Sequence, residues 1–293
     1  MKQFIKYYIK DSILLGLEKT KLFLFPRKKP ILVFTMAKVG SLSVYFSLKK
    51  RLFKNALFHV HSLNEIEIKK GIRLCFQNRV YPGSKTPVFL INKKIITQQR
   101  PFKIVCLFRD PLERNISAFF DAFKLYTGTK PNDYNGSSKK LKEYYDENLN
   151  HEFPLNWFDD QFFDATNINI YDYKFDKEQG YSILKTGTIE LLLINSDLND
   201  SIKENLIKDF CNLKSFKLKN RNLSSSKEYE LISSADKKLI EQTAELTRDL
   251  RDLMSDQSLN NYIKSVINIS FLTNKYINDE EPWKLKDNKD KMN

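Results

Sequence analysis

The chain has 293 residues, of which 41% are hydrophobic and 29% charged, and its formal net charge is +13 at pH 7. This length suits one large α/β domain or two small ones, and the 22 phenylalanines and 14 tyrosines exclude collagen-like, coiled-coil and disordered classes. A basic chain favours an anionic partner, which could be nucleic acid, an acidic membrane or a phosphorylated small molecule.

We expect a reduced, cytoplasmic protein without a membrane span. No run of about 18 uncharged apolar residues occurs. Asp11 and Glu18 interrupt the apolar stretches near the start, which argues against a signal peptide. Three widely spaced cysteines, Cys75, Cys106 and Cys211, predict neither a disulfide framework nor a zinc site, and no metal is expected.

Residues 1–25 have the pattern of an amphipathic helix. Its apolar row at i, i+4 spacing consists of Ile5, Ile9, Ile13 and Leu17, with lysines on other faces. Residues 1–29 hold eight basic and two acidic residues. Two interpretations stay open: the helix lies on an anionic membrane surface, at its inner face, or it packs on the domain's own core.

The rest of the chain alternates apolar strands with helices. Strands are predicted at 31–36, 56–60, 102–108 and 189–194, with shorter ones at 88–91 and 169–173. Helices are predicted at 42–52, 66–76, 111–125 and 155–165, with a polar loop at 126–140 and three helices from 202 onward. This order predicts a doubly wound parallel sheet flanked by helices, with a helical C-terminal part. We therefore divide the chain into a basic helix (1–29), an α/β domain (30–278) and a charged tail (279–293).

Two buried strands run into loops that open helices, and such junctions bind anions through backbone N–H groups and the helix dipole. The first loop, 35–43, offers Lys38, Gly40 and two serine hydroxyls, and the second, 109–117, offers two arginines and Ser117. Asp110, Pro111 and Glu113 instead have the spacing of a structural capping box. Two anion sites on neighbouring strand ends predict one ligand with two separate phosphate groups.

These residues resemble the sulfotransferases that use 3′-phosphoadenosine 5′-phosphosulfate as donor. The resemblance rests on Lys38-x-Gly40-Ser41-x-Ser43 after the first strand and on Arg109-Asp110-Pro111-x-x-Arg114-x-x-Ser117 after a later one. It is strongest over roughly residues 31–125, and the chain also looks like bacterial proteins of capsular polysaccharide synthesis. The resemblance implies a P-loop-like parallel sheet.

For the donor site, the resemblance implies that the loop binds the 5′-phosphosulfate through Lys38, Val39, Gly40, Ser41, Leu42 and Ser43. Lys38 would also assist catalysis at the leaving oxygen, whereas Arg109 and Ser117 would bind the 3′-phosphate. Lys227, in a region where relatives cover the adenosine, is a further candidate for cofactor contact. The product would be 3′,5′-ADP, and no metal is required.

A base must remove the proton of the acceptor hydroxyl. Family members carry a His or Glu a little over twenty residues after the loop lysine, and here His59 and His61 follow Lys38 by 21 and 23 residues. Alternate strand residues share one face, so both histidines would lie together. His61 is the preferred base because it is nearer the end of the strand, His59 is the second choice, and Glu65 is a fallback.

The predicted reaction is transfer of a sulfo group to a hydroxyl of a saccharide, such as a capsular or surface polysaccharide. Aromatic residues at 153–181 could stack on sugars, although Trp157 and Phe162 also fit a plain core stripe. One alternative is a P-loop-type phosphotransferase, whose Gly-Lys-Ser/Thr motif is not found. Another is a non-enzymatic protein that binds a membrane surface or nucleic acid. Nucleic acid is not the expected partner, because the arginines do not cluster with aromatic residues.

Overall fold

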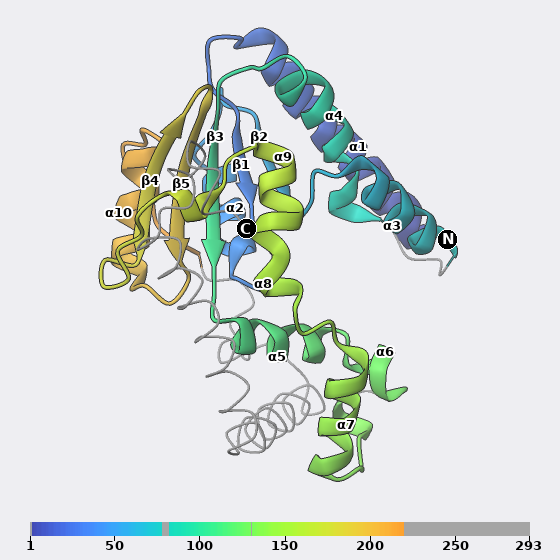
Figure 1. The fold of residues 1–293 in the computed structure, drawn as a ribbon. Coiled ribbons are helices and arrows are strands. Elements are labelled where there is room, and N and C mark those ends of the chain that lie inside the picture. The colour runs from blue at the N-terminus through green and yellow to red at the C-terminus, as the bar shows by residue number, and fades with distance from the viewer. Residues whose placement is uncertain (1, 78–81, 130, 220–293) are drawn as a thin grey trace, which may run out of the picture. The chain divides into compact units, whose positions relative to one another are not determined.

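The computed structural model describes residues 2–77, 82–129 and 131–219 (Figure 1). These form two compact units, which are described separately. The first unit holds the residues up to Ala122 and those from Leu149 onward, and the second holds Phe123–Asn148. The C-terminal helices after 219, Lys227 and the charged tail lie outside the described residues.

The first unit is built on a five-stranded sheet with the order β2-β1-β3-β5-β4. The strands are β1 (Ile31–Phe34), β2 (Leu57–Val60), β3 (Phe102–Phe108), β4 (Tyr181–Thr186) and β5 (Ile189–Asn195). The pairs β1–β2, β1–β3 and β3–β5 are parallel, and only β4 is antiparallel to its neighbour. Every residue of β1 and β2 is buried, which explains the continuous apolar sequence of β1 and leaves His59 as the one polar residue within β2. The predicted α/β class with a mostly parallel sheet is thus confirmed.

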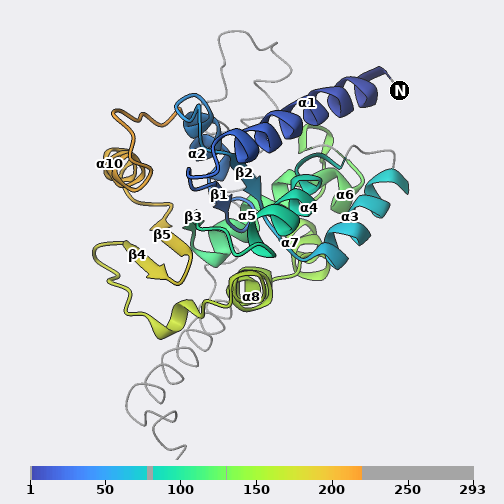
Figure 2. The ribbon, with the colours of Figure 1, turned by 90° about the horizontal axis from the view of Figure 1, so that it is seen from above.

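Helices cover both faces of the sheet, as Figure 2 shows for α2 (Ser41–Lys49) and α10 (Asp200–Phe210) on one side and α8 (Phe153–Trp157) on the other. A π-helical turn, η4 (Phe158–Phe163), and α9 (Asp164–Thr166) continue α8. Trp157 and Phe162 are fully buried, and both rings pack against Phe34 of β1. These two aromatic residues therefore belong to the core, as the helical spacing allowed.

Other helices lie around this framework. They are α1 (Lys2–Leu24), α3 (Glu65–Gln77), η1 (Gly83–Lys85), α4 (Pro87–Ile91), the π-helical η2 (Asn92–Ile96), α5 (Pro111–Asp121) and η5 (Ile170–Asp172). Among the described residues, no helix is long and apolar enough to cross a membrane.

The second unit contains α6 (Phe123–Thr127), η3 (Pro131–Asp133) and α7 (Ser138–Asn148). The polar loop predicted at 126–140 is therefore shorter than expected. Helix α7 begins inside it because Leu141 and Tyr145, four residues apart, bury their side chains almost completely.

Two predicted strands are wrong. Residues 88–91 belong to helix α4, in which Pro87 occupies the first turn and Val88 and Ile91, three residues apart, are buried together with Ile95 of the following turn. Residues 169–173 form a single 3-10 turn instead, because the Asn169 side chain accepts a hydrogen bond from the backbone N–H of Tyr171. The antiparallel strand β4 was not predicted, since its half-exposed residues give only a weak pattern.

Helix α1 covers the edge of the sheet at β2. The Glu18 carboxylate accepts a hydrogen bond from the backbone N–H of Leu57 at 2.8 Å and pairs with Lys21 at 2.9 Å. Glu18 is only 8% exposed, and Leu22 on the same side of α1 is 7% exposed. A side chain of α1 thus satisfies a backbone donor that an edge strand would otherwise leave unpaired.

We expect Glu18→Ala to destabilise the protein by about 1–3 kcal/mol, because the buried N–H of Leu57 would lose its acceptor. Glu18→Gln should cost less, since its side-chain carbonyl can still accept that bond. Lys19→Ala, at an exposed position of the same helix, is the matched control. Urea unfolding of the three variants measures the difference, and equal effects of Glu18→Ala and Lys19→Ala would contradict the assignment.

Candidate functional site

The carboxyl ends of β1, β2 and β3 meet at one edge of the sheet, because these three strands are parallel. The loop that contains Lys38 follows β1, and the loop that contains Arg109 follows β3. Since β1 and β3 are neighbours, both predicted anion-binding loops lie at the same edge on adjacent strands. Open α/β sheets bind their ligands at this edge.

The loop after β1 turns sharply into α2. Lys38 and Gly40 both have left-handed backbone conformations, with φ of 72° and 79°. A glycine suits the second position because of this φ alone, since an added Cβ would meet nothing within 4 Å. Val39 between them is 1% exposed and anchors the loop in the core. Helix α2 then begins without a side-chain cap at Gly40, and in its first turn the backbone N–H of Ser43 donates to the Gly40 carbonyl oxygen at 3.1 Å.

The loop after β3 is closed by the capping residues that the sequence predicted. Asp110 caps α5 by accepting a hydrogen bond from the backbone N–H of Glu113 at 2.9 Å, and Pro111 is in the first turn. Arg109 pairs with the Glu113 carboxylate at 3.0 Å, while both side chains stay about one-third exposed. Ser117 lies on the same helix and is half-buried.

Helix α5 links the two loops through a buried arginine. Arg114, 7% exposed, donates from Nε to the carbonyl oxygen of Ala37 at 3.2 Å and from Nη1 to Asn115 Oδ1 at 2.9 Å. At the far end of the helix, Asp121 pairs with Lys38 Nζ at 2.5 Å. The sequence predicts Arg114 as one of two arginines for anion binding, whereas its described hydrogen bonds are to Ala37 and Asn115 within the protein.

The two histidines of β2 lie side by side, as alternate strand residues should. Their ring centroids are 4.6 Å apart. His59 is 9% exposed and shares a hydrogen bond of 2.9 Å between its Nε2 and Ser41 Oγ, the first residue of α2. The ring of Tyr45 on α2 stacks on His59 with centroids 5.5 Å apart. The β2 histidines are thus connected to the loop that contains Lys38.

The protonated nitrogen of His61 is fixed by its hydrogen bond. Its Nδ1 lies 2.7 Å from the carbonyl oxygen of Thr35, which can only accept, so Nδ1 carries the hydrogen. The Nε2 atom of the neutral ring is then the basic one. Trp157 holds the backbone of the same residue by donating from Nε1 to the His61 carbonyl oxygen at 3.0 Å.

Burial keeps both histidines neutral. Desolvation, together with the neighbouring His61, lowers the pKa of His59 to about 3. Desolvation also lowers the pKa of His61, although the hydrogen bond to Thr35 opposes this, and the nearby cations Lys85, Arg114 and Lys38 lower it further. At neutral pH each ring therefore has one nitrogen able to accept a proton.

The remaining candidates are placed as follows. The Glu65 carboxylate accepts a hydrogen bond from Asn92 of η2 at 3.2 Å and pairs with Lys69 of α3 at 3.4 Å. Both of these partners lie outside the two loops. The third histidine of the chain, His151, accepts a hydrogen bond from Asn115 at its backbone carbonyl at 3.0 Å. Lys227 lies outside the described residues.

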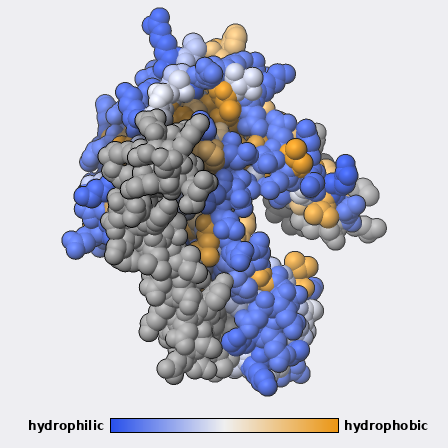
Figure 3. Space-filling view, viewed as in Figure 1, coloured by the Kyte–Doolittle hydropathy of each residue, from blue (hydrophilic) through white to orange (hydrophobic). Residues whose placement is uncertain are grey.

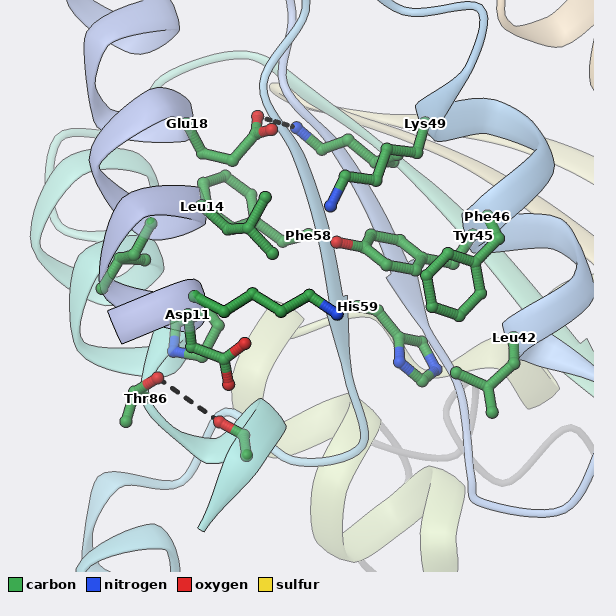
Figure 4. A pocket seen from close by; sticks show the side chains of 15 residues that line it. Asp11, Leu14, Glu18, Leu42, Tyr45, Phe46, Lys49, Phe58, His59 and Thr86 are labelled. Atoms are coloured by element: carbon green, nitrogen blue, oxygen red, sulfur yellow. Dashed lines mark hydrogen bonds between the residues drawn. The ribbon is translucent and has the colours of Figure 1, made fainter. Parts of the chain in front are cut away.

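A pocket of about 250 Å³ lies between α1 and α2 and reaches His59. Figure 4 shows Asp11, Leu14 and Glu18 of α1 on one side, and Tyr45 and Phe46 among the α2 side chains on the other. Burial and the carboxylates of Glu18 and Asp11 raise the pKa of Tyr45 to about 12, so its hydroxyl remains a hydrogen-bond donor. The pocket thus offers aromatic faces, a few polar groups and a neutral imidazole.

Fold and site together describe an α/β protein in which the loops that carry Lys38 and Arg109 lie at one edge of the sheet, with a histidine pair on the neighbouring strand. A family model described as "Putative capsular polysaccharide synthesis protein" matches residues 131–266. The chain is similar to this family over a region that follows both loops. No curated protein and no solved structure matches the chain.

The low pKa of His59 predicts a pH-dependent stability. The unfolded chain, with an ordinary histidine pKa near 6.5, binds the proton first as the pH falls. The contribution of neutral His59 is therefore complete above about pH 6.5 and is lost below it at about 1.4 kcal/mol per pH unit, down to the folded pKa of about 3.

His59→Gln keeps a side chain able to bond Ser41 but cannot titrate. Its stability relative to the wild type should therefore rise by about 2 kcal/mol between pH 6.5 and pH 5. Urea unfolding at both pH values measures this, and parallel pH curves would contradict it.

Proposed function

We propose that this protein is a sulfotransferase that moves a sulfo group from 3′-phosphoadenosine 5′-phosphosulfate to a hydroxyl of a saccharide. The observation that carries the proposal is the pairing of two cationic loops on adjacent parallel strands, joined by α5. Such a pair suits a ligand with two separate phosphate groups. The proposal is supported by the position of Lys38 and Arg109, which lie in loops that follow adjacent parallel strands, so that each could face one phosphate of the same ligand.

The donor's groups match the chemistry of each loop. Lys38, as a mobile point charge, would neutralise the 5′-phosphate as its oxygen leaves. Arg109, with a planar guanidinium, and Ser117 would hold the 3′-phosphate. Lys38 forms an ion pair with Asp121, and Arg109 forms one with Glu113, and both pairs are partly exposed to solvent. Phosphate oxygens could take the place of these carboxylates.

The histidines supply the base. His61 would accept the proton of the acceptor hydroxyl at Nε2, because its Nδ1–H is held by Thr35. The acceptor oxygen would bond to sulfur as the bond between sulfur and the phosphate oxygen breaks. His59 is the second candidate, favoured by one specific observation: it is the histidine that lines the pocket between α1 and α2.

That pocket would receive the acceptor. Tyr45 and Phe46 offer aromatic faces to a sugar ring, and the Asp11 carboxylate could accept hydrogen bonds from its hydroxyls. The similarity to a capsular polysaccharide synthesis family supports a saccharide acceptor. Because the matched region follows both loops, it supports the acceptor class and not the donor.

Calorimetry separates this proposal from the two alternatives. A sulfotransferase of this kind binds 3′,5′-ADP without metal, a P-loop-type phosphotransferase binds ATP–Mg²⁺, and a nucleic-acid-binding protein binds an oligonucleotide. Titration of the full-length protein with each ligand in turn tests all three. Failure to bind 3′,5′-ADP would overturn the proposal.

We expect Arg109→Ala to weaken binding of 3′,5′-ADP by about 10- to 150-fold, because a charged hydrogen bond contributes roughly 1.5–3 kcal/mol. Affinity for 5′-AMP should be nearly unchanged, since it lacks the 3′-phosphate. Arg51→Ala is the matched control, because Arg51 is exposed after α2 at the opposite edge of the sheet. Equal losses for the two nucleotides would show that Arg109 binds no 3′-phosphate.

We expect His61→Asn to reduce turnover by about 10²–10⁴-fold, the contribution of a positioned base, with 3′,5′-ADP affinity unchanged. Asparagine can still donate to the Thr35 carbonyl, so the variant tests the base and not the fold. The measurement is sulfo transfer to a saccharide acceptor, with His59→Gln in parallel. A larger loss in His59→Gln would assign the base to His59, and full activity in both variants would exclude the pair.

A further inference from the structure

Helix α1 packs on the sheet with an unexpected face. Its buried side carries the Glu18 carboxylate and Leu22, and Leu15 packs partly against the core. The predicted apolar row points away from the core: Ile9 is 53% exposed, Ile13 59% and Leu17 53%. One face of the helix therefore belongs to the fold, and the opposite apolar face is exposed in the part of the chain that the structure describes. That this face lies on a membrane stays a prediction.

The exposed apolar surface continues past the helix. Phe23 and Leu24 at the end of α1 are 82% and 58% exposed, and Phe53 in the loop after α2 is 80% exposed. That loop lies near the segment that follows α1, because Lys54 Nζ lies 5.8 Å from the centre of the Phe25 ring and Asn55 Nδ2 donates to the Lys29 carbonyl oxygen at 2.8 Å. The face drawn in Figure 3, on which α4 lies in front of α1, is mostly hydrophilic with small apolar groups, and Figure 2 shows α1 along the opposite side of the molecule. Contiguous exposed apolar surface of this kind marks an interaction site.

The charges around this surface are of one sign. The exposed charged residues of 9–28 and 51–55 are all basic: Lys10, Lys19, Arg27, Lys28, Arg51 and Lys54. The two acidic residues of α1 are not exposed, because Glu18 is buried against Leu57 and Asp11 lines the pocket toward α2. The surface is thus apolar with a basic surround.

We propose that the outer face of α1, with Phe23, Leu24 and Phe53, docks on an anionic phospholipid membrane. An amphipathic helix that lies in the bilayer interface inserts an aliphatic and aromatic face and keeps lysines and arginines at the headgroups. Each basic residue near such a surface adds to binding when the lipids are anionic. The inner face of a cell membrane carries such lipids, which agrees with a cytoplasmic, peripheral location. This surface is distinct from the candidate active site, so it does not depend on the proposed reaction.

Vesicle sedimentation of the full-length protein tests the proposal. At low salt the wild type should sediment with phosphatidylglycerol-containing vesicles and not with pure phosphatidylcholine. Ile13→Asp should weaken this binding roughly tenfold or more, because it replaces an inserted aliphatic group by a charge of the wrong sign. Ile202→Asp is the matched control, since Ile202 is also an exposed helical isoleucine, on α10.

Three results would overturn the proposal: no sedimentation of the wild type, equal binding to neutral vesicles, or unchanged binding of Ile13→Asp. Sedimentation equilibrium of the same proteins tests the alternative that a second copy of the chain binds this face. A wild-type dimer that Ile13→Asp dissociates, without vesicle binding, would show that this face joins two copies of the chain. Binding of 3′,5′-ADP should be the same in all variants, so failure here and failure of the proposed function are distinguishable.

Discussion

The buried guanidinium of Arg114 is the interaction on which the candidate site depends. A buried charge is tolerated only where hydrogen bonds satisfy it, and this one is satisfied by Ala37 in the loop after β1 and by Asn115 on its own helix. It also lies 4.5 Å from the centre of the Phe153 ring, at the start of α8. Three segments that are distant in sequence are therefore held together by one side chain. The relative placement of the two cationic loops follows from the parallel strands and from this contact.

Much of this arrangement could be predicted from the sequence, and the reasons are local. Continuous apolar runs identified β1, β3 and β5, the order Asp110, Pro111 and Glu113 identified the start of α5, and the alternation of His59 and His61 placed both rings together. The failures also have local causes. The four apolar residues at 88–91 are too few to distinguish a strand from a helix. The helical conformation buries Val88 and Ile91 on the same side, which is a tertiary effect.

Other features depend on contacts between distant residues, which no local pattern contains. The ion pair of Lys38 with Asp121 and the tautomer of His61 both arise only when β1, β2 and α5 are assembled. The orientation of α1 is a further case. Its sequence pattern leaves open whether the isoleucine row packs on the core or lies on a membrane, whereas the structure buries the side that carries Glu18, whose carboxylate accepts a hydrogen bond from Leu57 at the β2 edge. The buried side of this 23-residue helix combines that acceptor with the apolar contacts of Leu15 and Leu22.

In this orientation α1 separates the pocket from the exposed apolar face. Its inner side, through Asp11 and Leu14, lines the pocket that reaches His59, and its outer side is the exposed apolar face. A helix with its side chains is about 10–12 Å thick, so the pocket lies about one helix diameter from whatever the outer face contacts. On a bilayer, as proposed above, that thickness would set the distance between the lipid headgroups and the pocket that reaches the His59 imidazole.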